Sequence, residues 1–419
     1  MIILIAATLL GLYMAWNIGA NDVANSMADA VGSRALSVRR AVVAAAIFEF
    51  LGAVLVGAHV TDTVRKGIVT PTVFAHDPGL FAMGMACSLL AAALWLNLAS
   101  WWGMPVSTTH SIVGAIAGFG LVVAGLNAVN WHKLSQIIMS WLISPMAGGV
   151  MAYLIFRVTV WLILGRDRPT TAAVYFVPFI VFYTVFMMSL ATIFKGLGHI
   201  IHEKNLAFLT GANALVFSAA AGLATAAASR ILLRKAMSGW HHKPLEEQLE
   251  RVERSLAPLV IFTSCCVAFA HGSNDVANAI GPLAAIVDVI RTNAVKLKVA
   301  VPLWVLALGG MGIALGLATY GYRVMYTVGT RITQLTPSRG IAADVATATV
   351  VLVCSRMKLP ISTTHTIVGA IFGVGMARGL AAVDSRVVKQ IAFSWLLTVP
   401  VTAALSAILV LAAWRTWGG

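Results

Sequence analysis

Charged residues are scarce in this 419-residue chain. Only 11% of its residues are Asp, Glu, Lys or Arg, while 59% are hydrophobic and the mean hydropathy is +0.89. A soluble globular chain carries about 25% charged residues, so the shortage excludes a soluble enzyme. Because one bilayer crossing takes about 20 residues, the length suits about ten to twelve helices in a single membrane domain.

Cysteines are few, and the common catalytic motifs are absent. The four cysteines, Cys87, Cys265, Cys266 and Cys354, lie in or beside apolar stretches without CxxC or Cys/His ligand spacing. This argues against a disulfide framework and a zinc site, and predicts small buried hydrophobic side chains. No HExxH, Gly-x-Ser-x-Gly or Walker sequence is present, so we expect neither a membrane-embedded enzyme nor an ATP-driven pump.

Apolar windows occur twelve times along the chain and predict its membrane segments. They cover residues 2–20, 41–60, 80–99, 105–125, 134–156, 172–194, 206–229, 257–273, 299–319, 340–355, 359–377 and 391–413. No basic segment precedes the first window, so a cleaved signal peptide is not expected. The one clearly polar stretch, residues 230–256, is basic and charged and is predicted to form a short amphipathic helix in a cytoplasmic connecting loop.

The net charge of +14 reflects basic residues scattered between the apolar windows, a pattern that reports topology rather than nucleic-acid binding. With the 230–256 loop inside, seven crossings place the N-terminus outside. Arg34, Arg39 and Arg166 then lie inside, as the positive-inside rule requires. In the second half, Arg291 and Arg356 fall outside and disagree with this orientation.

Three motifs occur twice, in the same order and 253 to 255 residues apart. The repeated pairs are Asn21-Asp22-Val23-Ala24-Asn25 with Asn274-Asp275-Val276-Ala277-Asn278, Ser107-Thr108-Thr109-His110 with Ser362-Thr363-Thr364-His365, and Ser140-Trp141-Leu142 with Ser394-Trp395-Leu396. This indicates a duplicated unit. An odd number of crossings separates the two copies, which inverts the second one, as in secondary transporters.

The predicted fold is therefore an all-α polytopic membrane protein with two inverted-topology repeats and re-entrant or broken helices. Residues 1–165 form the first repeat and 257–419 the second. Between them lie two intervening helices (166–229) and the charged loop (230–256).

The Asn-Asp motifs each place an acid at the end of an apolar run, where a carboxylate is expensive to insert. Candidate cation-binding residues are Asn21, Asp22, Asn25, Asn274, Asp275 and Asn278. Their carboxylate and amide oxygens suit a hard cation such as Na⁺, at Asp22 and Asp275 above all. Gly19 and Gly272 are expected to let the helices unwind there. The alternative is that these polar groups only form hydrogen bonds between packed helices. The presence of a second copy of the motif disfavours this alternative.

The Ser-Thr-Thr-His motifs each follow a proline and open a small apolar run, as a half-helix begins. Candidate anion-binding residues are Ser107, Thr108, Thr109, Ser362, Thr363 and Thr364. Free N–H groups, the positive end of the helix dipole and hydroxyls together form an anion site. Capping of the helix by the same hydroxyls is expected as well.

Together the two motifs predict coupled transport, because nearby carboxylates repel an anion unless cations or protons neutralise them. Phosphate, with four oxygens, fits hydroxyls and amides from two half-helix ends. Sulfate or another tetrahedral oxyanion is the alternative substrate, although phosphate retains a proton that an acid can accept. A passive channel is a further alternative, which the paired motifs disfavour.

With Gly19 to Asn25 and Gly272 to Asn278, the chain resembles the inorganic phosphate transporter (PiT) family over both halves. The resemblance implies uptake of phosphate with Na⁺ or H⁺ across the cell membrane, phosphate at the Ser/Thr/Thr motifs, cations at the Asn/Asp motifs, no other cofactor, and a homodimer with outside termini. Glu49 resembles a family glutamate and either helps to couple cations or is a paired structural acid. His110 and His365 either contact phosphate or protons, or pack the half-helices.

Overall fold

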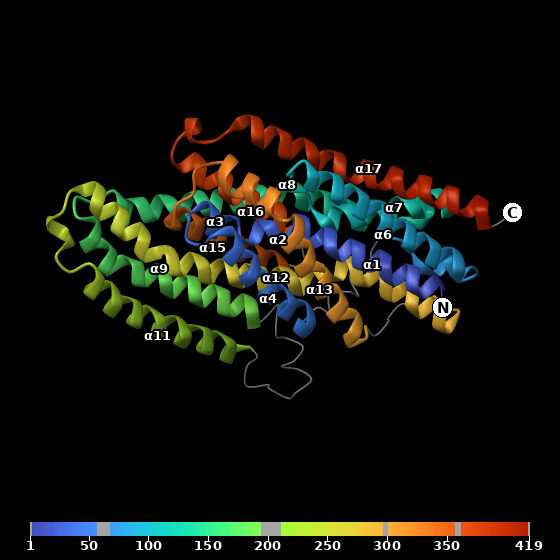
Figure 1. Ribbon diagram of the computed structural model, residues 1–419, viewed down its shortest axis with the longest axis horizontal. Helices are drawn as coiled ribbons and strands as arrows, with labels where there is room; N and C mark the ends of the chain where they lie inside the picture. Colours follow the sequence, from blue (N-terminus) through green and yellow to red (C-terminus); the bar gives the residue numbers. More distant parts are fainter. Residues whose placement is uncertain (1, 57–67, 194–210, 296–300, 357–361, 418–419) are drawn as a thin grey trace.

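The computed structural model describes residues 2–56, 68–193, 211–295, 301–356 and 362–417. Pro360, the proline before the second Ser-Thr-Thr motif, lies outside these ranges. Figure 1 shows an elongated bundle whose longer helices run roughly along one axis, with both termini near the same end. Within the described ranges there is no β-strand beyond an isolated bridge between Val69 and Val129.

Each predicted apolar window overlaps a helix of the structure. In chain order they are α1 (Ile2–Asn21), α2 (Val23–Ser26), α3 (Ala28–Gly32), α4 (Val38–Val56), η2 (Pro71–Phe74), α6 (Pro78–Trp101), α7 (Thr108–Ala124), η3 (Leu126–Ala128), α8 (Trp131–Thr159), η4 (Val160–Leu164), α9 (Pro169–Ala191), α11 (Ala212–Ala236), η7 (Trp240–His242), α12 (Leu245–Thr292), α13 (Leu303–Tyr320), α14 (Tyr322–Tyr326), η8 (Thr327–Arg331), α15 (Pro337–Arg356), α16 (Thr363–Ala377), η9 (Leu380–Ala382) and α17 (Ser385–Trp417).

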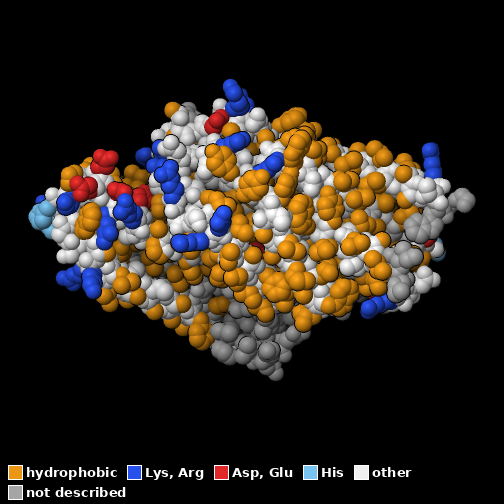
Figure 2. Space-filling view, in the orientation of Figure 1, with side chains coloured by type: hydrophobic (Ala, Val, Ile, Leu, Met, Phe, Trp, Pro, Cys, Tyr) orange, Lys and Arg blue, Asp and Glu red, His pale blue; other side chains and the backbone are white. Residues whose placement is uncertain are grey.

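Nine helical stretches in the described part of the chain are long and apolar enough to cross a bilayer. Two further apolar helices, α7 and α16, have only 17 and 15 residues, which is short for a full crossing. The surface in Figure 2 is largely hydrophobic along the bundle, while Lys, Arg, Asp and Glu gather toward one end. The prediction of a polytopic α-helical membrane protein is therefore confirmed.

The charged stretch at 230–256 contains the expected helix, but this helix is the start of a membrane segment and not a separate element. α11 continues to Ala236, and α12 begins at Leu245 and runs without interruption for 48 residues into the membrane segment. Ion pairs one turn apart support this polar first part, including Arg254 with Glu250 at 2.5 Å. The Arg251 guanidinium also donates to the carbonyl of Ala236 at 3.2 Å, so the polar start of α12 is tied to α11.

The two Asn-Asp motifs have different backbones. In the first copy the helix is interrupted at Asp22, between α1 and α2. In the second copy Asp275 lies inside the continuous helix α12. The expected unwinding at Gly272 is therefore wrong. A Cβ at Gly272 would clash with the backbone of Glu49, and one at Gly19 with the backbone of Ile313, so these glycines permit close helix contact.

The short helices α7 and α16 each pack against a long helix of the other half of the chain, α7 on α17 and α16 on α8. Glycines make both contacts possible. A Cβ at Gly118 would clash with the backbone of Ala403, and one at Gly373 with that of Gly149. Helices of the two halves also pack against each other at α1 with α13 and at α4 with α12. The two motif copies are thereby brought together at the centre of the bundle.

Candidate functional site

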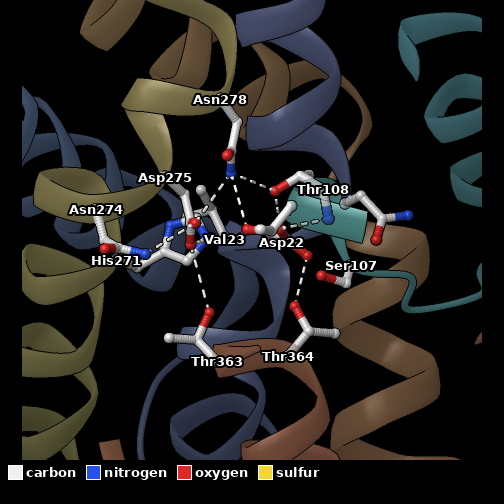
Figure 3. A network of polar contacts seen from close by, with 12 residues as sticks. Asp22, Val23, Ser107, Thr108, His271, Asn274, Asp275, Asn278, Thr363 and Thr364 are labelled. Atoms are coloured by element: carbon white, nitrogen blue, oxygen red, sulfur yellow. Dashed lines mark hydrogen bonds and ion pairs between the residues drawn. The ribbon is translucent and has the colours of Figure 1, made fainter. Parts of the chain in front are cut away.

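The candidate site lies where the break after α1, the middle of α12 and the first turns of α7 and α16 meet. Figure 3 shows Thr108 on α7, and Thr363 and Thr364 on α16, directed toward the carboxylates of Asp22 and Asp275. Asp22 is 3% exposed and Asp275 2% exposed. The site therefore unites both copies of both predicted motifs, deep inside the protein.

Asp22 accepts hydrogen bonds from both Ser-Thr-Thr motifs at once. The Thr108 hydroxyl donates to its Oδ2 at 2.6 Å, and the Thr364 hydroxyl donates to its Oδ1 at 2.6 Å. The backbone N–H of Thr108 also donates to Oδ2, at 3.3 Å. Two hydroxyls predicted to bind an anion are thus bonded to a carboxylate, and such charge-assisted bonds are strong.

Asp275 is held by amide groups and by a third threonine. Oδ1 accepts from the side-chain amides of Asn278 at 3.1 Å and Asn274 at 3.2 Å. Oδ2 accepts from the Thr363 hydroxyl at 3.4 Å. Asn278 also donates to the hydroxyls of Thr108 and Thr109, at 3.1 and 3.2 Å. This asparagine joins the carboxylate of one copy to the hydroxyls of the other.

His271, which the sequence analysis missed, lies among the acids. Its Nε2 is 2.8 Å from Oδ2 of Asp275 and 3.8 Å from Oδ2 of Asp22. Its Nδ1 is 3.0 Å from both carboxylate oxygens of Glu49, which is 0% exposed. Glu49 is thus a buried acid paired with this histidine. A histidine one turn before Asp275, in an apolar run, was the available sequence signal.

Three groups that can hold a metal ion come together here. One oxygen each from Asp22 and Asp275 and one nitrogen from His271 lie within 4.8 Å of one another. Asn25 is 3% exposed, and neither polar atom of its side chain has a hydrogen-bond partner. Asn25 lines a cavity with Asp22, His271 and Thr364, so its amide is available to a ligand there. Two carboxylates, a histidine nitrogen and an amide without a hydrogen-bond partner thus surround this cavity.

Asn21 and the two serines hold the site together instead of facing the cavity. The Asn21 amide donates to Ser100 Oγ and to the Met104 carbonyl, both at 3.0 Å, and its oxygen accepts from the Val106 N–H at 2.9 Å. All three bonds fix the chain that leads into α7. Ser107 and Ser362 accept from backbone N–H groups three residues ahead and cap α7 and α16.

His110 and His365 lie in an aromatic cluster. Their rings contact each other edge to face with centroids 4.5 Å apart. His365 stacks on Trp395 at 3.8 Å, and His110 lies 4.0 Å from the ring of Trp141. These contacts join the first turns of α7 and α16 to α8 and α17. Their geometry corresponds to the packing alternative considered for both histidines.

A bundle of membrane-spanning helices around buried acids, amides and hydroxyls defines a membrane transporter of small ions. Comparison with known sequences makes the class specific, because the pattern of the phosphate transporter family matches residues 18–406. The chain belongs to this family, whose members are transporters and not enzymes.

Individual relatives agree over almost the whole chain. The "putative phosphate permease" of Pyrococcus furiosus is 43% identical over 407 residues, covering 97% of this chain and 95% of that protein. The chloroplastic inorganic phosphate transporter 2-1 of Arabidopsis thaliana is 42% identical over 427 residues, covering 96% of this chain and 71% of that protein. A solved structure titled "The sodium-dependent phosphate transporter" matches with a TM-score of 0.86 and 43% identity, covering 99% of both chains.

Proposed function

We propose that this protein is a sodium-coupled symporter of inorganic phosphate that works by alternating access in the cell membrane. The observation that carries the proposal is that Thr108 and Thr364, one from each motif copy, both donate their hydroxyls to Asp22. Phosphate needs these same donors. Asp22 and phosphate therefore compete for two hydroxyls and one backbone N–H.

A cation resolves this competition. A sodium ion beside Asp22 neutralises the carboxylate and replaces its hydrogen bonds with metal–oxygen contacts. Thr108 and Thr364 then turn their hydroxyls toward phosphate, whose charge the cation also offsets. A second sodium ion at Asp275 acts in the same way on Thr363 and Asn278. Phosphate binds well only after the cations, which is the thermodynamic basis of symport.

Sodium is proposed over the proton because the similar solved structure is titled sodium-dependent and because Asn25 offers an uncommitted amide beside the carboxylates. We further propose that the two motif-bearing halves are inverted repeats and that the protein is a homodimer. In Figure 1 the α11–α12 connection lies at the end away from both termini. With this basic connection in the cytoplasm, the N-terminus is outside.

Uptake of labelled phosphate into proteoliposomes tests the proposal, with imposed sodium or proton gradients and sulfate as competitor. We expect saturable phosphate uptake driven by the sodium gradient, insensitive to sulfate and abolished in Asp22→Asn and Asp275→Asn. Uptake driven by a proton gradient alone contradicts sodium coupling. Accumulation of sulfate in place of phosphate contradicts the substrate.

A further inference from the structure

The central cavity is lined by sulfur as well as by oxygen and nitrogen. The thiol of Cys266 on α12 and the thioether of Met188 on α9 both line it, together with Asp22 and His271. Because α9 packs against α12 in the bundle (Figure 1), the two sulfur-bearing side chains come from neighbouring walls of one cavity. Sodium prefers oxygen ligands, so the proposed symport gives these sulfur atoms no role.

The Cys266 thiol is more accessible than the acids of the site. Cys266, Ala270 and Asn274 follow one another at intervals of four residues and therefore form one stripe on α12. All three line the cavity and are partly exposed, whereas Asp22 and His271 are only 3% and 4% exposed. Five residues of helix separate Cys266 from His271, which corresponds to about 8 Å. The thiol is thus open to a small ion that can reach the acids.

The cavity is small and contains a polar group without a partner. Its volume of about 50 Å³ is room for only a few water molecules. Asn25 lines it, is 3% exposed, and has no hydrogen-bond partner at either polar atom of its side chain. A buried amide of this kind indicates that the cavity receives a ligand. A metal ion bound at Cys266 fills much of so small a space and keeps other ions out of it.

We propose that Cys266 binds a soft, thiophilic metal ion such as Hg²⁺ or Ag⁺, with the Met188 sulfur as a second ligand, and that the bound ion blocks the cavity. Thiolate and thioether ligands select soft metal ions. The metal–sulfur bond forms at Sγ of Cys266 and the thiol proton leaves to water, so no oxidant or reductant is required. The neighbouring Cys265 packs in the hydrophobic core and is 8% exposed. The block, though not the binding, rests on the proposed symport.

The first test counts the mercury atoms bound to the purified full chain, by intact-protein mass spectrometry after brief exposure to HgCl₂ and removal of the excess. We expect Cys266→Ser to bind one mercury fewer than the parent, and the matched control Cys265→Ser to bind the parent number. An unchanged count in Cys266→Ser overturns the proposal. Misfolding does not imitate the expected loss, because a misfolded chain exposes more thiols and binds more mercury. Met188→Leu keeps the thiol and should lower the affinity for mercury; an unchanged affinity contradicts the second ligand.

The second test measures sodium-driven phosphate uptake into proteoliposomes after the same exposure to HgCl₂. We expect the parent and Cys265→Ser to lose this uptake and to recover it when dithiothreitol removes the mercury, whereas Cys266→Ser keeps it throughout. Equal inhibition of Cys266→Ser and the parent contradicts the block. The two proposals fail separately. If the parent takes up no phosphate under a sodium gradient while Cys266→Ser still binds one mercury fewer, the symport account is wrong and the soft-metal site stands.

Discussion

Replacing Thr364 by valine removes one hydroxyl from the centre of the site and keeps the shape of the side chain. That hydroxyl donates to Asp22 Oδ1 at 2.6 Å, and in the proposed mechanism it passes to phosphate when sodium binds. A hydrogen bond to a charged group is worth about 1.5–3 kcal/mol. Since about 1.4 kcal/mol is tenfold, phosphate affinity at saturating sodium should fall by about 10- to 150-fold.

The assay is equilibrium binding of labelled phosphate to purified protein at saturating sodium. Thr364→Ser retains the hydroxyl and should restore most of the affinity. Thr366→Val is the matched control, because its buried hydroxyl donates to the Ser362 carbonyl of its own helix at 2.8 Å and does not reach the carboxylates. If Thr364→Val binds phosphate as tightly as Thr366→Val, the hydroxyl does not contact phosphate and the reasoning is refuted.

Three further changes probe the surroundings of the site. Asn21→Ala removes three hydrogen bonds to the chain before α7. The protein should still fold, with a lower maximal uptake rate and a lower thermal midpoint. Unchanged values of both refute the positioning role of Asn21. His271→Gln leaves Glu49 buried without its partner, which should cost about 3–5 kcal/mol of stability. Adding Glu49→Gln should recover the thermal stability but not the uptake. If the single variant is as stable as the parent, the pairing is contradicted. Gly373→Ala overpacks the α16–α8 contact and should destabilise the protein by about 1–3 kcal/mol, measured as detergent thermostability. Gly79→Ala should not, because the nearest atom to the added Cβ, Oδ1 of Asp77, lies at an ordinary contact distance of 3.4 Å.

The sequence predicted the membrane segments well, because hydropathy over about 20 residues records the bilayer directly. It also selected Asp22, Asp275 and the threonines, because both motifs occur twice. It did not predict which hydroxyl meets which carboxylate. Thr364 and Asp22 are 342 positions apart, and their contact follows from the reciprocal packing of the two halves.

Other misses have similar physical causes. Asn21 resembles a cation ligand within its motif, but the adjacent chain at Val106 takes up its amide oxygen. The polar start of α12 was predicted as a separate segment, because hydropathy changes sharply there while the helix continues. His271 was passed over because it lies outside the repeated motifs. It is an ionisable residue in an apolar run, and this alone marks it as a candidate functional residue.

The central claim is that Asp22 and phosphate compete for the same donors until sodium binds. The most direct measurement is phosphate affinity as a function of sodium concentration, in the parent and in Asp22→Asn. By linkage, the logarithmic slope of phosphate affinity against sodium counts the ions taken up with phosphate. We predict that the slope falls by about one in Asp22→Asn, because a single sodium ion is lost. An unchanged slope would contradict the account.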